Sequence, residues 1–276
     1  MLDLTTPCCM GIINVTPDSF SDGGEFAKTG SRSFKVDVDK VLYKVEAYIQ
    51  QGASLVDIGG ESTRPGAASI SLDSELERTI PVIEAIKKNL DIRISVDTSS
   101  PVVMAEAITS GVEIINDVRA LSVPSAIEVA VNSNVAICLM HMKGQPVSMQ
   151  KSFHYNDVVS EVFDFLRTRI AACRLAGDIK QRLLIDPGFG FGKSVQHNYQ
   201  LLKSLSYFKK LGYPVLVGIS RKSMIGEVVN RPTEKRLNGS VAATALAINN
   251  GASVIRTHDV AATMDVIRVH CAYRDA

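Results

Sequence analysis

The sequence has 276 residues, of which 46% are hydrophobic and 21% are charged, and its formal net charge at neutral pH is +1. This composition is typical of a globular protein with a sizeable core. The near-neutral charge argues against a broad electrostatic surface for nucleic acid or an acidic membrane, so we expect neither as a partner. No apolar run approaches the length of a membrane span.

The N-terminal segment "MLDLTTPCCMGIINVT" lacks the basic and apolar regions of a signal peptide. The five cysteines are an odd number without CxxC spacing. Such sparse cysteines are typical of reduced, buried thiols, and we therefore expect a cytoplasmic protein.

Eight short apolar runs alternate along the chain with longer segments of helical period. The runs are residues 8–16, 54–60, 92–98, 112–118, 135–142, 182–188, 214–220 and 253–259. Their nearly continuous apolar character favours parallel strands covered on both faces. Eight such units predict a single (β/α)8 TIM barrel, with residues 1–276 forming one domain. A doubly wound open sheet is the alternative, but no GxGxxG fingerprint follows the first run.

Polar side chains end every one of these runs. They are Asn14, Asp57, Asp97, Asn116, Asp117, His141, Asp186, Ser220, Lys222, Arg256 and His258. Since active sites of this barrel lie at the C-terminal ends of the strands, this pattern predicts a functional rim. The alternative for any single aspartate is a helix cap or turn. Alternation along a strand means that only one of Asn116 and Asp117 points inward, and His141 could be structural.

The last two runs end in basic clusters, "SRK" at 220–222 and "RTH" at 256–258. The loops after strands seven and eight usually bind phosphate in this fold, so we expect a phosphorylated small molecule. Solvated surface charge is the weaker alternative. Asn14 and nearby aspartates would suit Mg²⁺, which takes few protein ligands and uses phosphate oxygens of the substrate.

Two long segments follow the first and second runs. They are residues 16–33, "TPDSFSDGGEFAKTGSRS", and residues 61–73, "ESTRPGAASISLD". Both exceed the usual length of a βα loop. Their internal glycines predict lids that close over the site, with unstructured padding as the alternative.

Eight motifs of this chain, in order, resemble the dihydropteroate synthase family of pterin-binding TIM barrels. They are "GIINVTPDSFSDGG", "VDIGGESTRPGA", "ISVDTSSP", "EIINDVRAL", "LMHMKGQPVSMQ", "LLIDPGFGFGKSVQHNYQLL", "VGISRKSMIG" and "IRTHDV". The resemblance implies a sulfonamide-target transferase of folate biosynthesis. It would join (7,8-dihydropterin-6-yl)methyl diphosphate to p-aminobenzoate, releasing pyrophosphate.

The resemblance also implies a role for each matched residue. The pterin would be surrounded by Asp97, Asn116, Asp186 and Lys222. The diphosphate would be held by Thr63, Arg256 and His258, with Asn14 binding Mg²⁺. The p-aminobenzoate site would be formed by Arg64, Pro65, Phe191, Ser220 and Lys222. Catalysis would depend on Asp97, Asp186, Lys222 and Arg256.

The stretch "IDPGFGFGKS" (185–194) places a carboxylate, three glycines and two aromatic rings together. Asp186 could accept two neighbouring donors of the pterin edge, since a carboxylate matches a guanidine-like fork. Either Phe189 or Phe191 could pack on an aromatic substrate, and the resemblance favours Phe191. Because an arylamine is a weak nucleophile, we expect the C–O bond to break before the amine attacks.

Two other functions remain as alternatives. A methyltetrahydrofolate-dependent corrinoid methyltransferase would hold a pterin but would lack the diphosphate contacts of "SRK" and "RTH". A non-catalytic pterin-binding protein would not need the residues of "DSFSDGG" and "STRPG".

The chain also has no charged residue from Leu237 to Ile255. An outer helix without a charged stripe favours a covered face, so we expect a homodimer through the last two helices.

Overall fold

The computed structural model describes residues 4–17, 25–28, 34–62, 70–144, 154–177 and 179–276. Within these ranges lie the strands β1 (Cys8–Asn14), β2 (Leu55–Gly59), β3 (Arg93–Asp97), β4 (Ile114–Asp117), β5 (Ala136–Met140), β6 (Leu183–Asp186), β7 (Leu216–Val217) and β8 (Val254–Thr257). Each expected run contains one of these strands.

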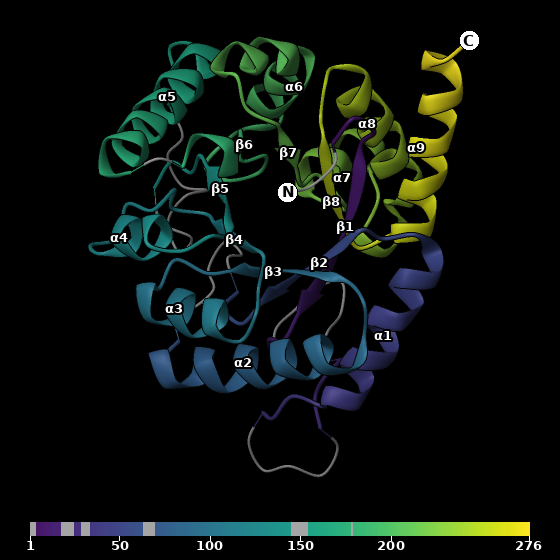
Figure 1. The fold of residues 1–276 in the computed structure, drawn as a ribbon. Coiled ribbons are helices and arrows are strands. Elements are labelled where there is room, and N and C mark those ends of the chain that lie inside the picture. Colours follow the sequence, from purple (N-terminus) through teal and green to yellow (C-terminus); the bar gives the residue numbers. More distant parts are fainter. Residues whose placement is uncertain (1–3, 18–24, 29–33, 63–69, 145–153, 178) are drawn as a thin grey trace.

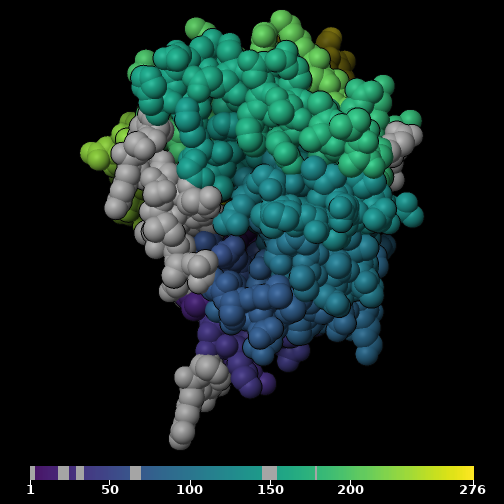
Figure 2. All heavy atoms as spheres, turned by 90° about the vertical axis from the view of Figure 1, so that its left-hand side faces the viewer, coloured from purple at the N-terminus to yellow at the C-terminus, as the bar shows by residue number. Residues whose placement is uncertain are grey.

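Helices follow the strands and form an outer ring around the sheet (Figure 1). They are α1 (Val38–Gln51), α2 (Leu72–Asn89), α3 (Pro101–Thr109), α4 (Ala126–Val131), α5 (Val158–Ala176), α6 (Val195–Lys203), α7 (Ser223–Val229), α8 (Leu237–Asn249) and α9 (Val260–Arg274). Short 3₁₀ helices are η1 (Lys180–Arg182), η2 (Leu205–Leu211) and η3 (Thr233–Lys235). In the side view of Figure 2, segments coloured from blue to green form one continuous outer layer.

The strands pair in parallel in the order β6-β5-β4-β3-β2-β1-β8-β7. A parallel bridge between Ile185 and Val215 joins the two ends of this order and closes the barrel. The predicted (β/α)8 barrel is therefore confirmed. Strand β7 is shorter than its apolar run, because Pro214 has no N–H for a ladder and contributes only its carbonyl, which accepts from the Ile185 N–H at 3.0 Å.

The hydrophobic side chains divide into two layers, one on each face of the sheet. The layer inside the barrel consists of Cys8, Met10, Leu55, Ile114, Cys138, Leu184, Leu216 and Val254. The larger layer lies between the strands and the helices. Helix α5 shows how the helices join it: Val158, Val162, Leu166 and Ile170 recur at helical spacing and are buried, while the Asp157 side chain caps the first turn.

Long connections follow two strands, as expected from the sequence. Residues 15–37 link β1 to α1, and residues 60–71 link β2 to α2. A third long connection, residues 141–157 after β5, was not among the long segments expected from the sequence. None of the helices in the described ranges is long and apolar enough to cross a membrane.

Two glycines with similar left-handed backbone angles allow a matched test of packing in the β6–α6 loop. Gly188 has φ +72°, and a Cβ there would lie far inside contact distance of the His141 carbonyl oxygen. Gly212 has φ +80° and nothing within 4 Å of the same position. We expect Gly212→Ala to lower the free energy of unfolding by about 1 kcal/mol, the cost of the backbone alone. Gly188→Ala should cost about 3 kcal/mol or more, because the loop must also move.

Urea denaturation of both variants measures the two costs. Equal losses of stability would contradict the close approach of this loop to the end of β5.

Candidate active site

A layer of polar side chains lies inside the barrel, directly above the apolar layer. Four of its members, Asp57, Asn116, Asp186 and Arg256, follow inward-facing apolar residues by two positions, so they point to the same side of the sheet. Asp57 follows Leu55 on β2 in this way, and Asp186 follows Leu184 on β6. The same spacing places Asn116 and Arg256 inward from β4 and β8, while Asp97 ends β3. The interior of the barrel therefore has a polar layer at its C-terminal end, and the apolar layer lies directly beneath it.

Arg256 crosses this end of the barrel and binds two carboxylates. Its Nε donates to Asp57 Oδ2 at 2.6 Å, and its Nη2 donates to Asp97 Oδ2 at 3.1 Å. The Asn116 side chain also donates to Asp57 Oδ2, at 3.1 Å. Four strands are thus linked through three side-chain hydrogen bonds.

Asp57 is the residue of this layer that received no role from sequence reasoning. It is fully buried, and its second oxygen, Oδ1, has no hydrogen-bond partner among the described residues. The signal that could have identified it is its position two residues after Leu55, at a strand end that otherwise carries only apolar residues and glycine. Burying a carboxylate there is costly unless it is paired, and Arg256 supplies the pair.

Asn116 and Asp117 face opposite sides of β4, as alternation requires. Asp117 accepts hydrogen bonds from the Ser99 hydroxyl at 2.5 Å and from the backbone N–H groups of Arg119 and Leu121 at 2.8 and 2.6 Å. Asp117 therefore fixes the turn after β4 and takes no part in the polar layer.

Burial shifts the pKa values of the charged groups in the polar layer. It raises the pKa of Asp97 from 3.8 to about 7, against the opposing effect of Arg256 and with a further increase from Asp57. Burial also raises the pKa of Asp186, while Lys222 lowers it. The pKa of Lys222 falls from 10.5 to about 8 through burial, although Asp186 opposes that shift. Three carboxylates thus face two cations, and the pKa of Asp97 lies close to neutral pH.

Asp186 is fixed by its own loop. Its Oδ1 accepts the Gly188 N–H at 2.7 Å, and no other side chain or backbone N–H of the described residues binds its second oxygen. Lys222 lies on the far side of the same loop and donates to the Phe189 carbonyl at 2.6 Å. Of the two rings between which the sequence left a choice, Phe189 is fully buried in the core. Phe191 is only half-buried, with the Lys222 ammonium 4.6 Å from its centre.

The two expected basic clusters lie side by side, but Arg221 and Lys222 of the first cluster point in different directions. Arg221 turns away from Lys222 and forms a two-point ion pair with Asp259, at 2.9 and 2.5 Å. His258 lies beside Ser220, whose hydroxyl contacts its Nδ1 at 3.1 Å and accepts its backbone N–H at 3.2 Å. The Ser220 hydroxyl is therefore engaged within the protein.

The remaining expected residues lie at the rim or outside the described ranges. Asn14 ends β1, and its Oδ1 and Asp97 Oδ2 lie 3.4 and 3.9 Å from the position of a Cβ on Gly59. Thr63, Arg64 and Pro65 are outside the described residues, as are most of the loops expected to act as lids. No group of three His, Cys, Asp or Glu side chains in the described ranges could hold a metal ion.

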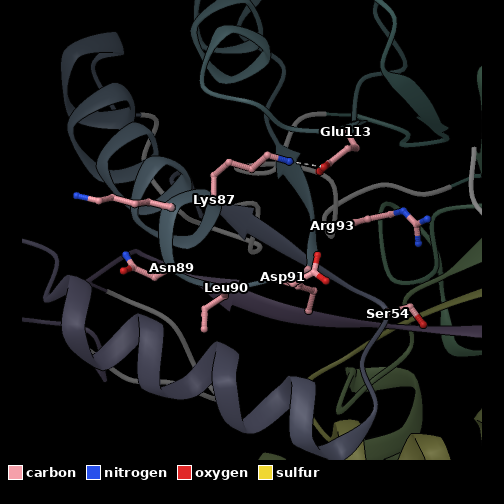
Figure 3. Close-up of a pocket in the computed structure, with 9 residues that line it drawn as sticks. Ser54, Lys87, Asn89, Leu90, Asp91, Arg93 and Glu113 are labelled. Carbon is pink, nitrogen blue, oxygen red and sulfur yellow. Dashed lines mark hydrogen bonds and ion pairs between the residues drawn. The ribbon is translucent and has the colours of Figure 1, made fainter.

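A cleft at the opposite end of the barrel has a different character (Figure 3). It lies where β2 to β4 begin and is lined by Ser54, Lys87, Lys88, Asn89, Leu90, Asp91, Ile92, Arg93 and Glu113. Lys87 pairs with Glu113 at 2.6 Å, and both side chains are largely solvated. This cleft has none of the convergent buried groups of the polar layer.

Comparison with known proteins agrees with this geometry. Residues 10–258 match the model of a family described as pterin binding enzyme. A dihydropteroate synthase of Haemophilus influenzae is 50% identical over 100% of this chain and 97% of its own length. The Escherichia coli K12 enzyme of that name is 48% identical, over 97% and 92% of the two chains. This chain belongs to the dihydropteroate synthase family.

Solved structures of dihydropteroate synthases have the same fold. That of Yersinia pestis, a complex with a sulfonamide drug, has a TM-score of 0.94 and 46% identity over 100% of this chain and 97% of that one. That of Xanthomonas albilineans, with 4-aminobenzoic acid, has a TM-score of 0.90 and 47% identity over 100% and 96%. The resemblance expected from the motifs is confirmed, and dihydropteroate synthases are transferases.

The raised pKa of Asp97 predicts a pH dependence of stability. The folded protein holds the proton of this carboxyl up to about pH 7, whereas the unfolded chain releases it near 3.8. The contribution of Asp97 to the free energy of unfolding therefore falls as the pH rises through this window. Asp97→Asn should flatten part of that decline, as measured by urea denaturation at a series of pH values.

Asp91→Asn is the matched control, since Asp91 is exposed at the other end of the barrel. If Asp97→Asn and Asp91→Asn kept the wild-type slope alike, Asp97 would not hold the proton.

Proposed function

We propose that this chain condenses (7,8-dihydropterin-6-yl)methyl diphosphate with p-aminobenzoate, giving 7,8-dihydropteroate and pyrophosphate in folate biosynthesis. The observation that carries the proposal is the buried polar layer formed by Asp97, Asn116, Asp186 and Arg256 at the C-terminal end of the barrel. The relatives support it, because a Xanthomonas albilineans enzyme of this family, 42% identical with a TM-score of 0.85, is described in complex with 7,8-dihydropteroate.

The polar layer suits the edge of a pterin. That edge presents an amino group and a ring N–H as neighbouring donors, and Asp186 has an oxygen free to accept from them. Asn116 and Asp97 meet the other edge, and Lys222 donates to a ring acceptor. A ligand that satisfies these buried groups is favoured over one that leaves them unpaired.

The p-aminobenzoate ring would pack on Phe191, next to the Lys222 ammonium. Arg64, Pro65 and Ser220 would complete this site. Since the Ser220 hydroxyl already contacts His258, its role would be to orient that imidazole as well as to border the arylamine. His258 and Arg256, with Thr63, would hold the diphosphate. Arg256 keeps Nη1 for this contact, because its Nε and Nη2 are bound by the two aspartates.

Asn14 would hold Mg²⁺ at the rim. Its amide oxygen is a suitable hard ligand beside Asp97, and Mg²⁺ draws its other ligands from water and substrate phosphates rather than from a cluster of side chains. When bound, the ion would neutralise charge on the leaving pyrophosphate.

We infer that the reaction begins with ionisation of the pterin substrate. The C–O bond breaks, pyrophosphate leaves with the electron pair, and the dihydropterin ring delocalises the positive charge on the methylene carbon. Asp97 and Asp186 stabilise that cation electrostatically, while Arg256 and His258 hold the anion. The neutral amine then attacks the carbon to form the C–N bond, and the proton that it loses passes to the released pyrophosphate. The loops after β1 and β2 would exclude water during the life of the cation.

The proposed reaction predicts pyrophosphate release that requires both substrates and Mg²⁺. Asp186→Asn presents a donor to the donors of the pterin, and its affinity for the pterin diphosphate should fall by about 2–5 kcal/mol. Calorimetric titration measures the change, and Asp164→Asn on the exposed side of α5 is the control. Unchanged pterin affinity in Asp186→Asn would remove Asp186 from the site, and no release of pyrophosphate would overturn the proposal.

The ionisation step predicts positional isotope exchange. Pterin diphosphate labelled at its bridging oxygen is incubated with the enzyme, Mg²⁺ and an unreactive p-aminobenzoate analogue. Return of the ion pair should scramble the label into non-bridging positions. Absence of scrambling, together with a steep dependence of turnover on arylamine basicity, would favour a concerted displacement instead.

We also propose a cytoplasmic homodimer formed through α8 and α9, which pack side by side (Figure 1). Leu246 on α8 and Val269 and Tyr273 on α9 are 53%, 70% and 74% exposed, respectively. Exposed apolar groups on adjacent helices favour a self-complementary contact. None of the five cysteines forms a disulfide, as is typical of a reducing compartment.

Light scattering at micromolar concentration should give twice the mass of one chain. Leu246→Glu combined with Val269→Glu should give the monomer mass. Leu175→Glu, at a 91% exposed position on α5, should leave the mass unchanged. A monomer mass for the unmodified protein would disprove the dimer.

A further inference from the structure

One charged residue of the stretch 185–194 has no part in the reaction proposed above. Lys193 is only 3% exposed, yet no carboxylate of the described residues is within hydrogen-bonding distance of it. Its ammonium donates to the Gly188 carbonyl at 2.7 Å, to the Phe191 carbonyl at 3.1 Å and to His141 Nδ1 at 2.9 Å. An ammonium has three hydrogens, and these three acceptors match them. Burial lowers the pKa of Lys193 well below its ordinary value, while the charge of Asp186 opposes that shift and favours the ammonium. The oxygen of His141 lies farther away, at 3.4 Å.

His141 accepts from Lys193 as a neutral imidazole. Burial, followed by the charge of Lys193, lowers the pKa of His141 to about 2. The His141 backbone N–H in turn donates to the Asp186 carbonyl at 3.0 Å. Lys193 therefore links the end of β5 to the end of β6 at the residue that carries the Asp186 carboxylate.

The loop around Lys193 is closely packed on the segment after β5. Gly188 and Gly192 have positive φ values, and a Cβ on either would overlap the carbonyl oxygen of His141 or Lys143. The Phe191 N–H closes a turn onto the Gly188 carbonyl at 3.2 Å, and Gly190 donates to the buried Asn198 side chain at 2.7 Å. These contacts fix the backbone of the turn where it packs against the segment after β5 and against α6.

Two ammonium groups hold this turn from opposite sides. Lys193 binds the carbonyls of Gly188 and Phe191 from the interior, and Lys222 binds the carbonyl of Phe189 between them. The Phe189 ring is directed into the core, while the Phe191 ring lies against Lys222 at the mouth. The direction of the Phe191 ring depends on the orientation of the peptide groups in the turn. The hydrogen bonds from Lys193 to the Gly188 and Phe191 carbonyls fix that orientation.

We propose that Lys193 is a positioning residue of the active site, whose buried ammonium orients the 188–191 turn so that the Phe191 ring and the Asp186 carboxylate are in place before the substrates bind. Which substrates these are rests on the proposed function, whereas the geometry of the turn does not. A side chain without hydrogen-bond donors would remove the Lys193 hydrogen bond from the partly buried Phe191 carbonyl and leave the buried Gly188 carbonyl with the Phe191 N–H alone. The turn would then rotate its peptide groups toward water.

Lys193→Met tests the proposal, because it keeps the length of the side chain and removes the donors. Lys203→Met at the exposed end of α6 is the matched control. The protein is labelled with 4-fluorophenylalanine, and Phe191→Leu identifies the fluorine signal of residue 191. In the protein without substrates, Lys193→Met should shift or broaden the Phe191 signal and leave that of Phe163, on α5, unchanged. Lys203→Met should change neither.

Steady-state kinetics give the functional measurement. Lys193→Met should raise the KM for p-aminobenzoate about ten- to a hundredfold, because the aromatic surface is misplaced. Lys193→Gln, which keeps amide donors, should recover part of this loss. The proposal would be overturned if the folded Lys193→Met protein kept the wild-type Phe191 signal and the wild-type KM. The same conclusion would hold if only its thermal stability fell, because Lys193 would then have a purely structural role.

If Lys193→Met does not fold, Lys193→Gln is compared with Lys203→Gln by the same two measurements, and wild-type values for both would again overturn the proposal. If the unmodified chain releases no pyrophosphate, the proposed function fails, while the fluorine spectra still decide the role of Lys193.

Discussion

The buried ion pairs of Arg256 determine what this end of the barrel can be. A guanidinium and three carboxylates lie inside a closed sheet, above an apolar base that holds no compensating charge. Isolated, each would be strongly disfavoured there. Arg256 binds Asp57 and Asp97 in one network, whereas the Asp186 carboxylate accepts the Gly188 N–H of its own loop. One acceptor of this network is left unsatisfied, because Asp57 Oδ1 has no hydrogen-bond partner in the part of the chain that the structure describes. A buried acceptor without a hydrogen bond favours the binding of a ligand with complementary donors over the binding of water.

The β6–α6 turn supports the network from the side. Its carbonyls are bound by Lys222 and Lys193, and its glycines allow it to approach the chain after β5. The same ten residues thus supply a carboxylate, an exposed ring and the means of holding both. Since these groups sit on strand ends and a packed turn, they keep their positions before a substrate arrives, which is the condition for electrostatic stabilisation of a transition state.

The sequence predicted several individual features for reasons that are local. Apolar runs of strand length alternating with helical segments gave the barrel, and the polar groups at the strand ends gave the end that carries the site. The period of two along a strand required Asn116 and Asp117 to separate, as they do. It did not reveal that β7 is only two residues long, because the length of a strand depends on how its neighbours pair with it. It also did not reveal that a third long connection follows β5. The roles of Thr63, Arg64 and Pro65 stay predictions.

By itself, the sequence determined the fold, the rim and the chemical types of the residues at that rim, since each of these follows from periodicity and from position within one βα unit. Only the tertiary structure decided which groups pair. Arg256 binds Asp57 across a separation of 199 residues. Arg221 turns to Asp259 rather than joining Lys222, and Lys193 is folded inward although it reads as an ordinary surface lysine at the start of a helix. These pairings depend on the closure of the barrel, which buries some charged groups and leaves others exposed to water. No local sequence pattern carries that information.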